Sequence, residues 1–414
     1  DSGMKKKIAL LMLCALSAFF LVGCGSSAPD PGKEKPNPYV TPIIWEDTNT
    51  YSMGWKGPIE LTDGTILSTQ MNPGSPLSGQ MIKCVASTDG GKTFKEIGTI
   101  ASEHPSADFG DSAMVQLSDG TILCSYRYNR YNYPTSGKSE HQIRMSYSTD
   151  GGKTWEFHSV VSEHTANSPG YNQGEQRGLW SQYILETSRG DIQCYYDDEN
   201  VCFENGYIGH QWWMMKTWNE ETRTWENPVA VGRTNTPSLL ARDGQGVVQE
   251  VAPGVLVTVF ESVRTTSPHR GCVRMTVSTD YGATWNYVDA NGNDNRKIVY
   301  VPEDENFSTL CPWLTILDGG VLMCTFMTDE DRETADNVAS GVLDQSMKYC
   351  LSYDQGETWS DPYMLDERHP LWGPGVILLE HGENAGKVFY QSVLITDNGN
   401  VTVHKLGELN LPQE

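Results

Sequence analysis

Carboxylate, guanidinium and indole side chains recur at the ends of apolar segments along this chain. Glu261 is the clearest case, because it ends an unbroken apolar run at 255–260. A carboxyl group in that position is expected to be partly shielded from water, a setting that raises its pKa. Two carboxyl groups with cations and aromatic rings nearby suit acid and base chemistry on a sugar, because aromatic rings stack on sugar faces. We therefore take these segment ends as the candidate site.

The candidate residues fall into two groups by the chemistry that they can perform. The candidate catalytic carboxyl groups are Glu261, Glu199, Glu175 and Asp243. The candidate substrate-binding residues are Lys56, Asp111, Arg127, Trp180, Arg264, Trp313, Asp329 and Trp372. Other charged residues at the same segment ends are Asp108, Asp197, Asp198, Arg242, Glu330 and Asp331. Each charged residue taken alone is also explained as a solvated loop residue, so the prediction depends on the elements that bring them together.

A short turn motif is repeated along the chain. The pattern S-x-D-x-G-x-T-[WF] occurs at 87–94, 148–155, 278–285 and 352–359, with a degenerate copy at 217–225. In such a turn the Asp accepts hydrogen bonds from backbone N–H groups, the Gly supplies a positive φ, and the aromatic residue anchors the next strand. These aspartates are therefore predicted to be structural and are not candidates for catalysis.

A second repeat, out of phase with the first, predicts the fold. An apolar strand, a tight turn and another apolar strand recur six times, at 59–69, 114–126, 183–196, 247–260, 314–326 and 376–391. A spacing of about 65 residues suits a four-stranded blade with long loops. We expect an all-β chain with a single six-bladed β-propeller over 41–414 and almost no helix. A β-sandwich is the alternative, but it does not explain two interleaved repeats.

The two repeats also orient the site. If the hairpins join strands one and two of each blade and the turn motifs join strands three and four, both kinds of turn lie on one edge. The candidate residues then gather on the opposite edge. Glu261 and Glu199 are predicted to occupy equivalent second-strand ends in adjacent blades, where their carboxyl groups approach to about 5–5.5 Å as in a retaining glycosidase. Arg127 or Arg264 nearby would separate their proton affinities.

The turn motifs resemble the Asp-box repeats of sialidases and related propeller glycosidases. Within that superfamily, the phrases at 116–129, 190–200, 242–261 and 324–331 resemble the retaining exo-α-1,5-L-arabinanase family, which releases short arabinose oligomers from arabinan ends. The resemblance implies an exo-acting glycoside hydrolase that cleaves α-L-arabinofuranosidic linkages with a carboxylate pair. It implies no metal and no organic cofactor.

Two alternative functions remain open. An exo-α-sialidase would bind the substrate carboxylate through Lys56, Arg127, Arg264 and either Arg274 or Arg332. However, the Arg-Ile-Pro of sialidases is replaced by Lys-Gly-Pro at 56–58, and 64–88 contains no acidic residue where a sialidase has its acid/base Asp. A non-catalytic glycan-binding propeller is the other alternative. It is favoured by Ser181, which stands where related propellers commonly have the Glu of a Trp-Glu-Pro sequence.

The N-terminal segment predicts export. Three lysines at 5–7 precede an apolar run at 8–22 that is too short to span a membrane. The sequence at 21–24 resembles a bacterial lipobox, in which Cys24 is acylated after cleavage, so residues 1–24 are predicted to be a lipoprotein signal. Residues 25–40 are predicted to be a flexible tether. We therefore expect an extracytoplasmic lipoprotein on a bacterial cell surface, with an ordinary secreted protein as the alternative.

Composition restricts the partners. The 53 acidic and 30 basic residues give a net charge of −23, which repels nucleic acid and anionic lipid. We expect a monomer that binds an oligo- or polysaccharide and contacts a membrane only through its lipid. The ten cysteines form no CxxC pair and no Cys/His cluster of metal-ligand type. Cys124, Cys194 and Cys324 are expected to be small buried hydrophobic residues, and one or two disulfides remain open.

Overall fold

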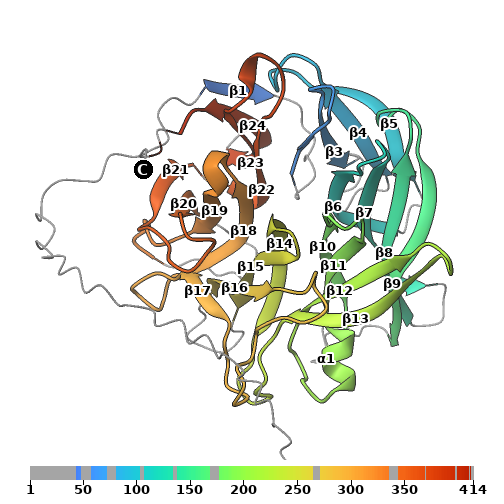
Figure 1. Ribbon diagram of the computed structural model, residues 1–414, viewed down its shortest axis with the longest axis vertical. Helices are drawn as coiled ribbons and strands as arrows, with labels where there is room; N and C mark the ends of the chain where they lie inside the picture. The colour runs from blue at the N-terminus through green and yellow to red at the C-terminus, as the bar shows by residue number, and fades with distance from the viewer. Residues whose placement is uncertain are drawn as a thin grey trace, which may run out of the picture. The chain divides into compact units, whose positions relative to one another are not determined.

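The computed structural model contains six antiparallel four-stranded sheets arranged in a ring, which confirms the six-bladed β-propeller (Figure 1). Within the residue ranges given at the end of this paragraph, the only α-helix is α1 (Asn200–Glu204). The other helical segments are short 3-10 turns such as η2 (Asp318–Gly320) and η4 (Gly382–Asn384). None of the helices seen there has the length and apolarity to cross a membrane. The structure describes residues 43–47, 57–71, 81–102, 107–133, 138–167, 177–263, 271–334, 344–368, 370–396, 399–409 and 411.

The first three blades follow one another along the chain. Blade 1 is formed by β2 (Ile59–Glu60), β3 (Ile66–Met71), β4 (Met81–Ser87) and β5 (Lys95–Ser102). Blade 2 is formed by β6 (Ala107–Gln116), β7 (Ile122–Tyr133), β8 (Lys138–Ser148) and β9 (Glu156–Asn167). Blade 3 is formed by β10 (Leu179–Glu186), β11 (Ile192–Asp198), β12 (Trp212–Asn219) and β13 (Thr224–Gly232).

The other three blades complete the ring. Blade 4 is formed by β14 (Arg242–Ala252), β15 (Val255–Val263), β16 (Gly271–Ser278) and β17 (Lys297–Tyr300). Blade 5 is formed by β18 (Thr309–Ile316), β19 (Leu322–Thr328), β20 (Ser346–Ser352) and β21 (Tyr363–Asp366). Blade 6 is formed by β22 (Pro370–Leu378), β23 (Val388–Thr396), β24 (Gly399–Gly407) and β1 (Ile43–Asp47). The first strands of blades 2 to 6 contact one another in succession, so they are the innermost strands.

The ring is closed by strands from the two ends of the propeller. β1 pairs antiparallel with β24, with Ile43 opposite Leu406 and Asp47 opposite Thr402, and it lies beside that strand in Figure 1. The sixth blade therefore takes three strands from the C-terminal part of the chain and its outer strand from the N-terminal part.

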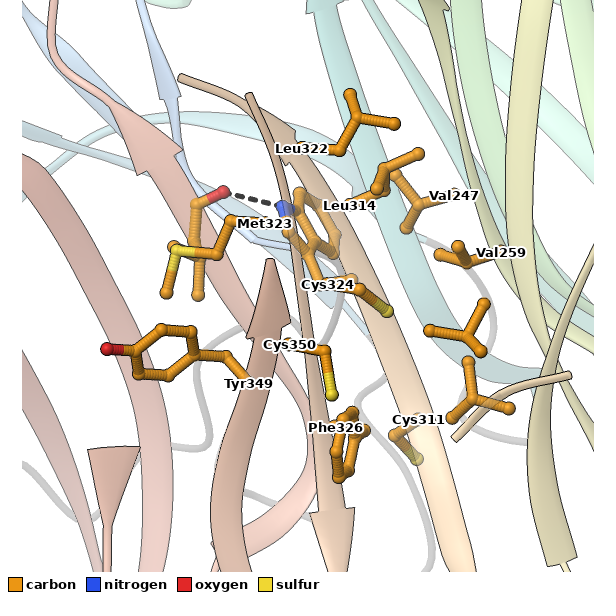
Figure 2. Packing of buried hydrophobic residues seen from close by; sticks show 14 of the residues in the cluster. Val247, Val259, Cys311, Leu314, Leu322, Met323, Cys324, Phe326, Tyr349 and Cys350 are labelled. Carbon is orange, nitrogen blue, oxygen red and sulfur yellow. Dashed lines mark hydrogen bonds between the residues drawn. The ribbon is translucent and has the colours of Figure 1, made fainter. Parts of the chain in front are cut away.

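Apolar side chains fill the spaces between neighbouring blades. Between blades 4 and 5, Val247 and Val259 pack with Leu314, Cys324 and Phe326, each of them fully buried (Figure 2). All eight cysteines of the described part of the chain are buried and unbridged. Cys124, Cys194 and Cys324 are completely inaccessible, which confirms that they serve as small hydrophobic residues.

The four turns with the S-x-D-x-G-x-T-[WF] motif, which we call Asp-box turns after the repeats that they resemble, share one set of hydrogen bonds. In blade 2, Ser148 Oγ donates to Asp150 Oδ1 at 2.8 Å, while the N–H and hydroxyl of Thr154 donate to the two carboxylate oxygens at 2.9 and 2.6 Å. The same three contacts recur at Asp89, Asp280 and Asp354. In the degenerate copy, Asn219 Oδ1 accepts the N–H groups of Glu221 and Thr222.

Both kinds of turn lie on one edge of the ring, as predicted. Tyr281 in the Asp-box turn of blade 4 donates its N–H to the carbonyl of Gly254, in the turn between β14 and β15, at 3.0 Å. The antiparallel strand order places the corresponding turns of the other blades on this same edge. We call the opposite edge, where first strands begin and second strands end, the site edge.

Candidate functional site

One position on the second strand places side chains at the site edge in blades 2, 3 and 4. Arg127, Asp197 and Glu261 are each the seventh residue after a positive-φ glycine of the preceding turn. Those glycines are Gly120, Gly190 and Gly254. In blades 5 and 6 the same position holds Met327 and Val393. The polar side chains at this position thus belong to three adjacent blades.

Glu199 does not share the position of Glu261, so the predicted equivalence of these two residues was wrong. Glu199 is the ninth residue after its turn glycine, as is Asp329 in blade 5. Both carboxylates are fully buried and accept a backbone N–H next to the first strand of their own blade, Glu199 from Gly178 and Asp329 from Ser308, each at 2.7 Å. Both carboxylates thus hold the start of the first strand of their own blade. This structural role replaces the predicted substrate-binding role of Asp329.

The second oxygen of Glu199 is also engaged. Glu199 Oε1 lies 2.5 Å from Arg242 NH1, and the same guanidinium donates to Gln211 Oε1 at 2.8 Å. The side chain of Arg242 is partly exposed, whereas that of Glu199 has no exposed surface. Glu199 therefore holds Arg242 in place and does not present a carboxylate at the site edge.

Asp197 and Glu261 each connect their blade to the next one. Asp197 Oδ1 accepts the N–H of Gln245 in blade 4 at 3.1 Å, and Glu261 Oε2 accepts the N–H of Cys311 in blade 5 at 2.8 Å. Asp197 is 1% exposed, and Glu261 is half-buried. Equivalent carboxylates in adjacent blades therefore make equivalent contacts, but Glu261 is the more accessible of the two.

The residues that donate to these carboxylates lie in β-bulges that the sequence analysis missed. The pairing of β14 shifts between Gly244 and Val247, and the pairing of β18 shifts between Leu310 and Trp313. Bulges add one residue to a strand and are common near functional sites. The bulge residues Asp111, Gln245 and Cys311 have φ values of 52°, 51° and 49°. The Gly-x-Gly at 244–246 is the signal that could have indicated one of them.

Gly244 lies between Asp197 and Glu261. It is the ladder partner of Glu261, and a Cβ at this position would overlap Asp197 Oδ1 and Gln211 Nε2. Only glycine fits where the backbone of blade 4 passes this close to the carboxylate of blade 3. Gly244 therefore adjoins the carboxylate of Asp197 and the backbone of Glu261.

Arg127 brings together three of the predicted residues. Its guanidinium donates to Asp111 Oδ2 at 2.8 Å and to Asp108 Oδ1 at 3.1 Å, and it lies 5.2 Å from the centre of the Trp180 ring. A cation over an indole face is an attractive contact. The charge of Arg127 is thus balanced within the protein, and the ring of Trp180 is held on the next blade.

Asp243 forms a buried ion pair, which corrects its prediction as a candidate catalytic carboxyl group. Its carboxylate lies 2.5 Å from Arg296 NH1, and the two side chains are 0% and 1% exposed. Burial disfavours the charged guanidinium, but the charges of Asp243 and Asp294 outweigh this effect and raise the pKa of Arg296. Asp243 therefore fixes Arg296 inside blade 4.

Trp313 is a core residue, which corrects its predicted role in stacking on a sugar. It is 6% exposed and donates its indole N–H to the carbonyl of Val376 at 2.6 Å. Its ring packs against Tyr183 at a centroid distance of 5.9 Å. The predicted residues Lys56, Glu175, Arg264 and Cys24, together with the side chain of Trp372, lie outside the described part of the structure.

Asp198 shows that a shifted pKa does not by itself identify the site. Burial raises the pKa of this carboxyl group to about 6, with Glu199 adding to the effect. However, Asp198 follows Asp197 on the strand, so alternation directs its side chain to the other face of blade 3. There it accepts the N–H of Val201 in α1 at 2.8 Å. Its surroundings are those of a buried residue that supports α1.

Two histidines flank the Arg127 cluster on adjacent strands. His141 and His164 are directly opposite on β8 and β9, and their rings stack at 6.4 Å. Burial, together with the charges of neighbouring cations, lowers the pKa of each to about 4. Within the described residues no group of three or more His, Cys, Asp or Glu side chains is arranged to hold a metal ion.

The fold has close counterparts among solved structures. A GH93 α-L-arabinofuranosidase of Fusarium graminearum, solved with arabinobiose, is 17% identical, with a TM-score of 0.63 over 89% of this chain and 98% of that chain. An α-L-arabinanase of Penicillium chrysogenum, also solved with arabinobiose, is 17% identical, with a TM-score of 0.61 over the same shares. The fold is that of the arabinanase propellers.

The likeness extends to sialidases. The K499G mutant of the NanB sialidase from Streptococcus pneumoniae is 13% identical, with a TM-score of 0.55 over 91% of this chain and 71% of that chain. No protein-family model and no curated protein matches the chain by sequence. The resemblance to propeller glycosidases is therefore confirmed for the fold.

Proposed function

We propose that this arabinanase-like propeller is an exo-acting glycoside hydrolase that cleaves α-L-arabinofuranosidic linkages. The observation that carries the proposal is the placement of Asp197 and Glu261 at the same position of adjacent blades, on either side of Gly244. They lie on the site edge, away from the Asp-box turns. Two structures with this fold were solved with arabinobiose.

The two carboxyl groups are assigned different tasks by their surroundings. Burial favours the neutral form of a carboxyl group, so the more deeply buried Asp197 is assigned as the proton donor to the leaving oxygen. The more accessible Glu261 is assigned as the nucleophile or base, because contact with water favours the ionised form of a carboxyl group. This assignment replaces Glu199 with Asp197 as the partner of Glu261. The chemistry needs no cofactor.

A neutral sugar suits this site better than sialic acid. Two arginines near the site edge already have carboxylate partners. Arg127 pairs with Asp108 and Asp111, and Arg242 pairs with Glu199. A substrate carboxylate requires fixed cationic partners and would compete with these built-in anions. Sialidase chemistry is therefore the weaker candidate.

The test is hydrolysis of a small panel by the purified full chain. We expect release of reducing sugar from linear arabinan and of phenol from an aryl α-L-arabinofuranoside, with no comparable release from sialyllactose or an aryl sialoside. Rapid cleavage of the sialosides would overturn the proposal in favour of a sialidase. Binding of arabinobiose without any turnover would support the glycan-binding alternative, for which Ser181 is the motivating residue.

We also propose that the chain is anchored at a bacterial cell surface through an acylated Cys24. The support is the lipobox-like sequence at 21–24 and the polar segment that follows it. An extracytoplasmic enzyme of this kind would meet its polysaccharide outside the cell as a monomer.

A further inference from the structure

Gln245 stands out among the three bulge residues with left-handed backbone. Asp111 and Cys311 are only 4% and 3% exposed, whereas Gln245 is half-buried. Its neighbours Gly244 and Gly246 are buried against blade 3, where a Cβ on Gly246 would overlap Trp213. Of the three bulges, this one therefore presents a polar side chain to solvent.

The backbone at Gln245 adjoins both residues that carry the assigned carboxylates. Its N–H donates to Asp197, and the residue before it pairs with Glu261. In the described part of the structure its carboxamide makes no hydrogen bond, whereas its backbone N–H donates to both carboxylate oxygens of Asp197. A carboxamide has two N–H donors and an acceptor oxygen, the groups that recognise sugar hydroxyls.

A left-handed φ at glutamine is unfavourable, whereas glycine adopts it without a steric penalty. Two adjoining positions of this bulge are already glycine, yet Gln245 is not. Strained residues of this kind cluster at active sites and ligand clamps, where the surrounding structure holds them in place. We propose that the carboxamide of Gln245 hydrogen-bonds the sugar held between Asp197 and Glu261 and helps to determine substrate specificity. This inference rests on the proposed function.

The Asp-box turns supply a matched control. Gln355 also has a positive φ, of 58°, and its equivalents in blades 1 and 2 are glycines, Gly90 and Gly151. Gln355 is exposed and lies on the edge opposite the site. Gln355→Gly therefore makes the same chemical change at the same backbone conformation, away from the proposed substrate.

The experiment compares Gln245→Gly, Gln245→Ala and Gln355→Gly with the unaltered protein. The readouts are hydrolysis of linear arabinan and of an aryl α-L-arabinofuranoside, affinity for arabinobiose by calorimetry, and thermal melting. We expect Gln245→Gly to melt no lower than the unaltered protein but to lose at least tenfold in kcat/KM, mostly through a higher KM, because the N–H to Asp197 is kept. Gln245→Ala should lose the same activity, and Gln355→Gly should lose none.

The outcomes separate this inference from the proposed function. If the unaltered protein cleaves arabinan and Gln245→Gly cleaves it with an unchanged KM, the inference is wrong and the proposed function stands. If the unaltered protein binds arabinobiose without cleaving it, a tenfold loss of affinity in Gln245→Gly still supports the inference. If the unaltered protein neither binds nor cleaves any of these sugars, both are overturned.

Discussion

Asp197 and Glu261 occupy the same position on the second strands of adjacent blades, and Gly244 separates them. Each accepts a backbone N–H from the first strand of the following blade, so neither carboxylate is a freely moving surface group. The blade framework thus holds each carboxyl group through a backbone contact with the following blade. Fixed geometry of this kind is what a two-carboxylate hydrolysis needs.

Glu261→Gln should keep the fold and abolish most turnover. The amide oxygen of glutamine still accepts the N–H of Cys311, but it cannot act as nucleophile or base. We expect kcat to fall about 10²- to 10⁴-fold or more, with melting temperature and arabinobiose affinity little changed. Glu383→Gln, an exposed residue in η4 on the other edge, is the control. Near-normal turnover in Glu261→Gln would remove this residue from the mechanism.

Asp197→Asn and Glu199→Gln should have opposite signatures. Asp197→Asn removes the assigned proton donor, so we expect a large loss of kcat with a modest change in stability. Glu199→Gln leaves Arg242 without its buried counter-ion and should cost about 1–3 kcal/mol of unfolding free energy. Denaturant unfolding and steady-state kinetics on both variants provide the measurement. A catalytic loss confined to Glu199→Gln would restore Glu199 as the partner of Glu261.

Acid should weaken the Asp-box turns. Hydrogen bonds from Thr154 and Ser148 lower the pKa of Asp150 from 3.8 to about 2. A carboxylate with a depressed pKa in the folded state adds stability above its unfolded pKa and loses it as the pH falls through the folded value. The melting temperature should therefore drop between about pH 4 and pH 2, less steeply in Asp150→Asn. Turnover at neutral pH should not change in that variant, and a large loss would contradict a structural role for the turn.

The stacked histidines should make the fold sensitive to mildly acidic pH. Burial lowers the pKa values of His141 and His164 to about 4, against an ordinary 6.5. The unfolded chain therefore binds protons between pH 6.5 and 4 that the folded chain does not, so stability falls across that window. In His164→Gln the melting temperature should fall less between pH 6.5 and 4 than it does in the unaltered protein. Above pH 7 the melting temperatures of the two proteins should change with pH in the same way. An unchanged slope between pH 6.5 and 4 would show that this pair is not responsible.

Cys24→Ala should release the protein from membranes. Acylation requires the thiol of that cysteine, so the variant expressed in a bacterium should appear in the soluble fraction. Cys14→Ala, within the apolar run of the same segment, is the control and should remain in the membrane fraction. Membrane retention of Cys24→Ala would refute the lipobox interpretation.

Local repeats were sufficient to predict the architecture. Turn chemistry at Asp150 and its counterparts depends on a few adjacent residues, so it can be recognised without tertiary information. Two repeats in a fixed order then determined which edge carries the turns. The clustering of Arg127 with Asp111 and Trp180 followed from that orientation.

The errors came from register and burial, which depend on contacts between distant segments. Glu199 and Glu261 both follow the apolar part of a second strand, but counting from the turn glycines places them at positions nine and seven. Trp313 is a residue type that stacks on sugars, yet its ring lies in the core, where its indole N–H donates to the carbonyl of Val376. The bulge at Gln245 adds one residue to β14 and so shifts the register of its pairing with β15. The Gly-x-Gly pattern at 244–246 is the only sequence feature that indicates this bulge.

The pairing of β1 with β24 has a kinetic consequence. The outer strand of the last blade is synthesised before any other strand of the propeller, and its partner is synthesised after almost all of them. Strand β1 consequently has no partner until the last strands of the propeller are synthesised, and its unpaired edge can capture another chain in the meantime. Ring closure joins residues more than 350 positions apart, so it carries the largest loop-closure entropy cost among the described strand pairings.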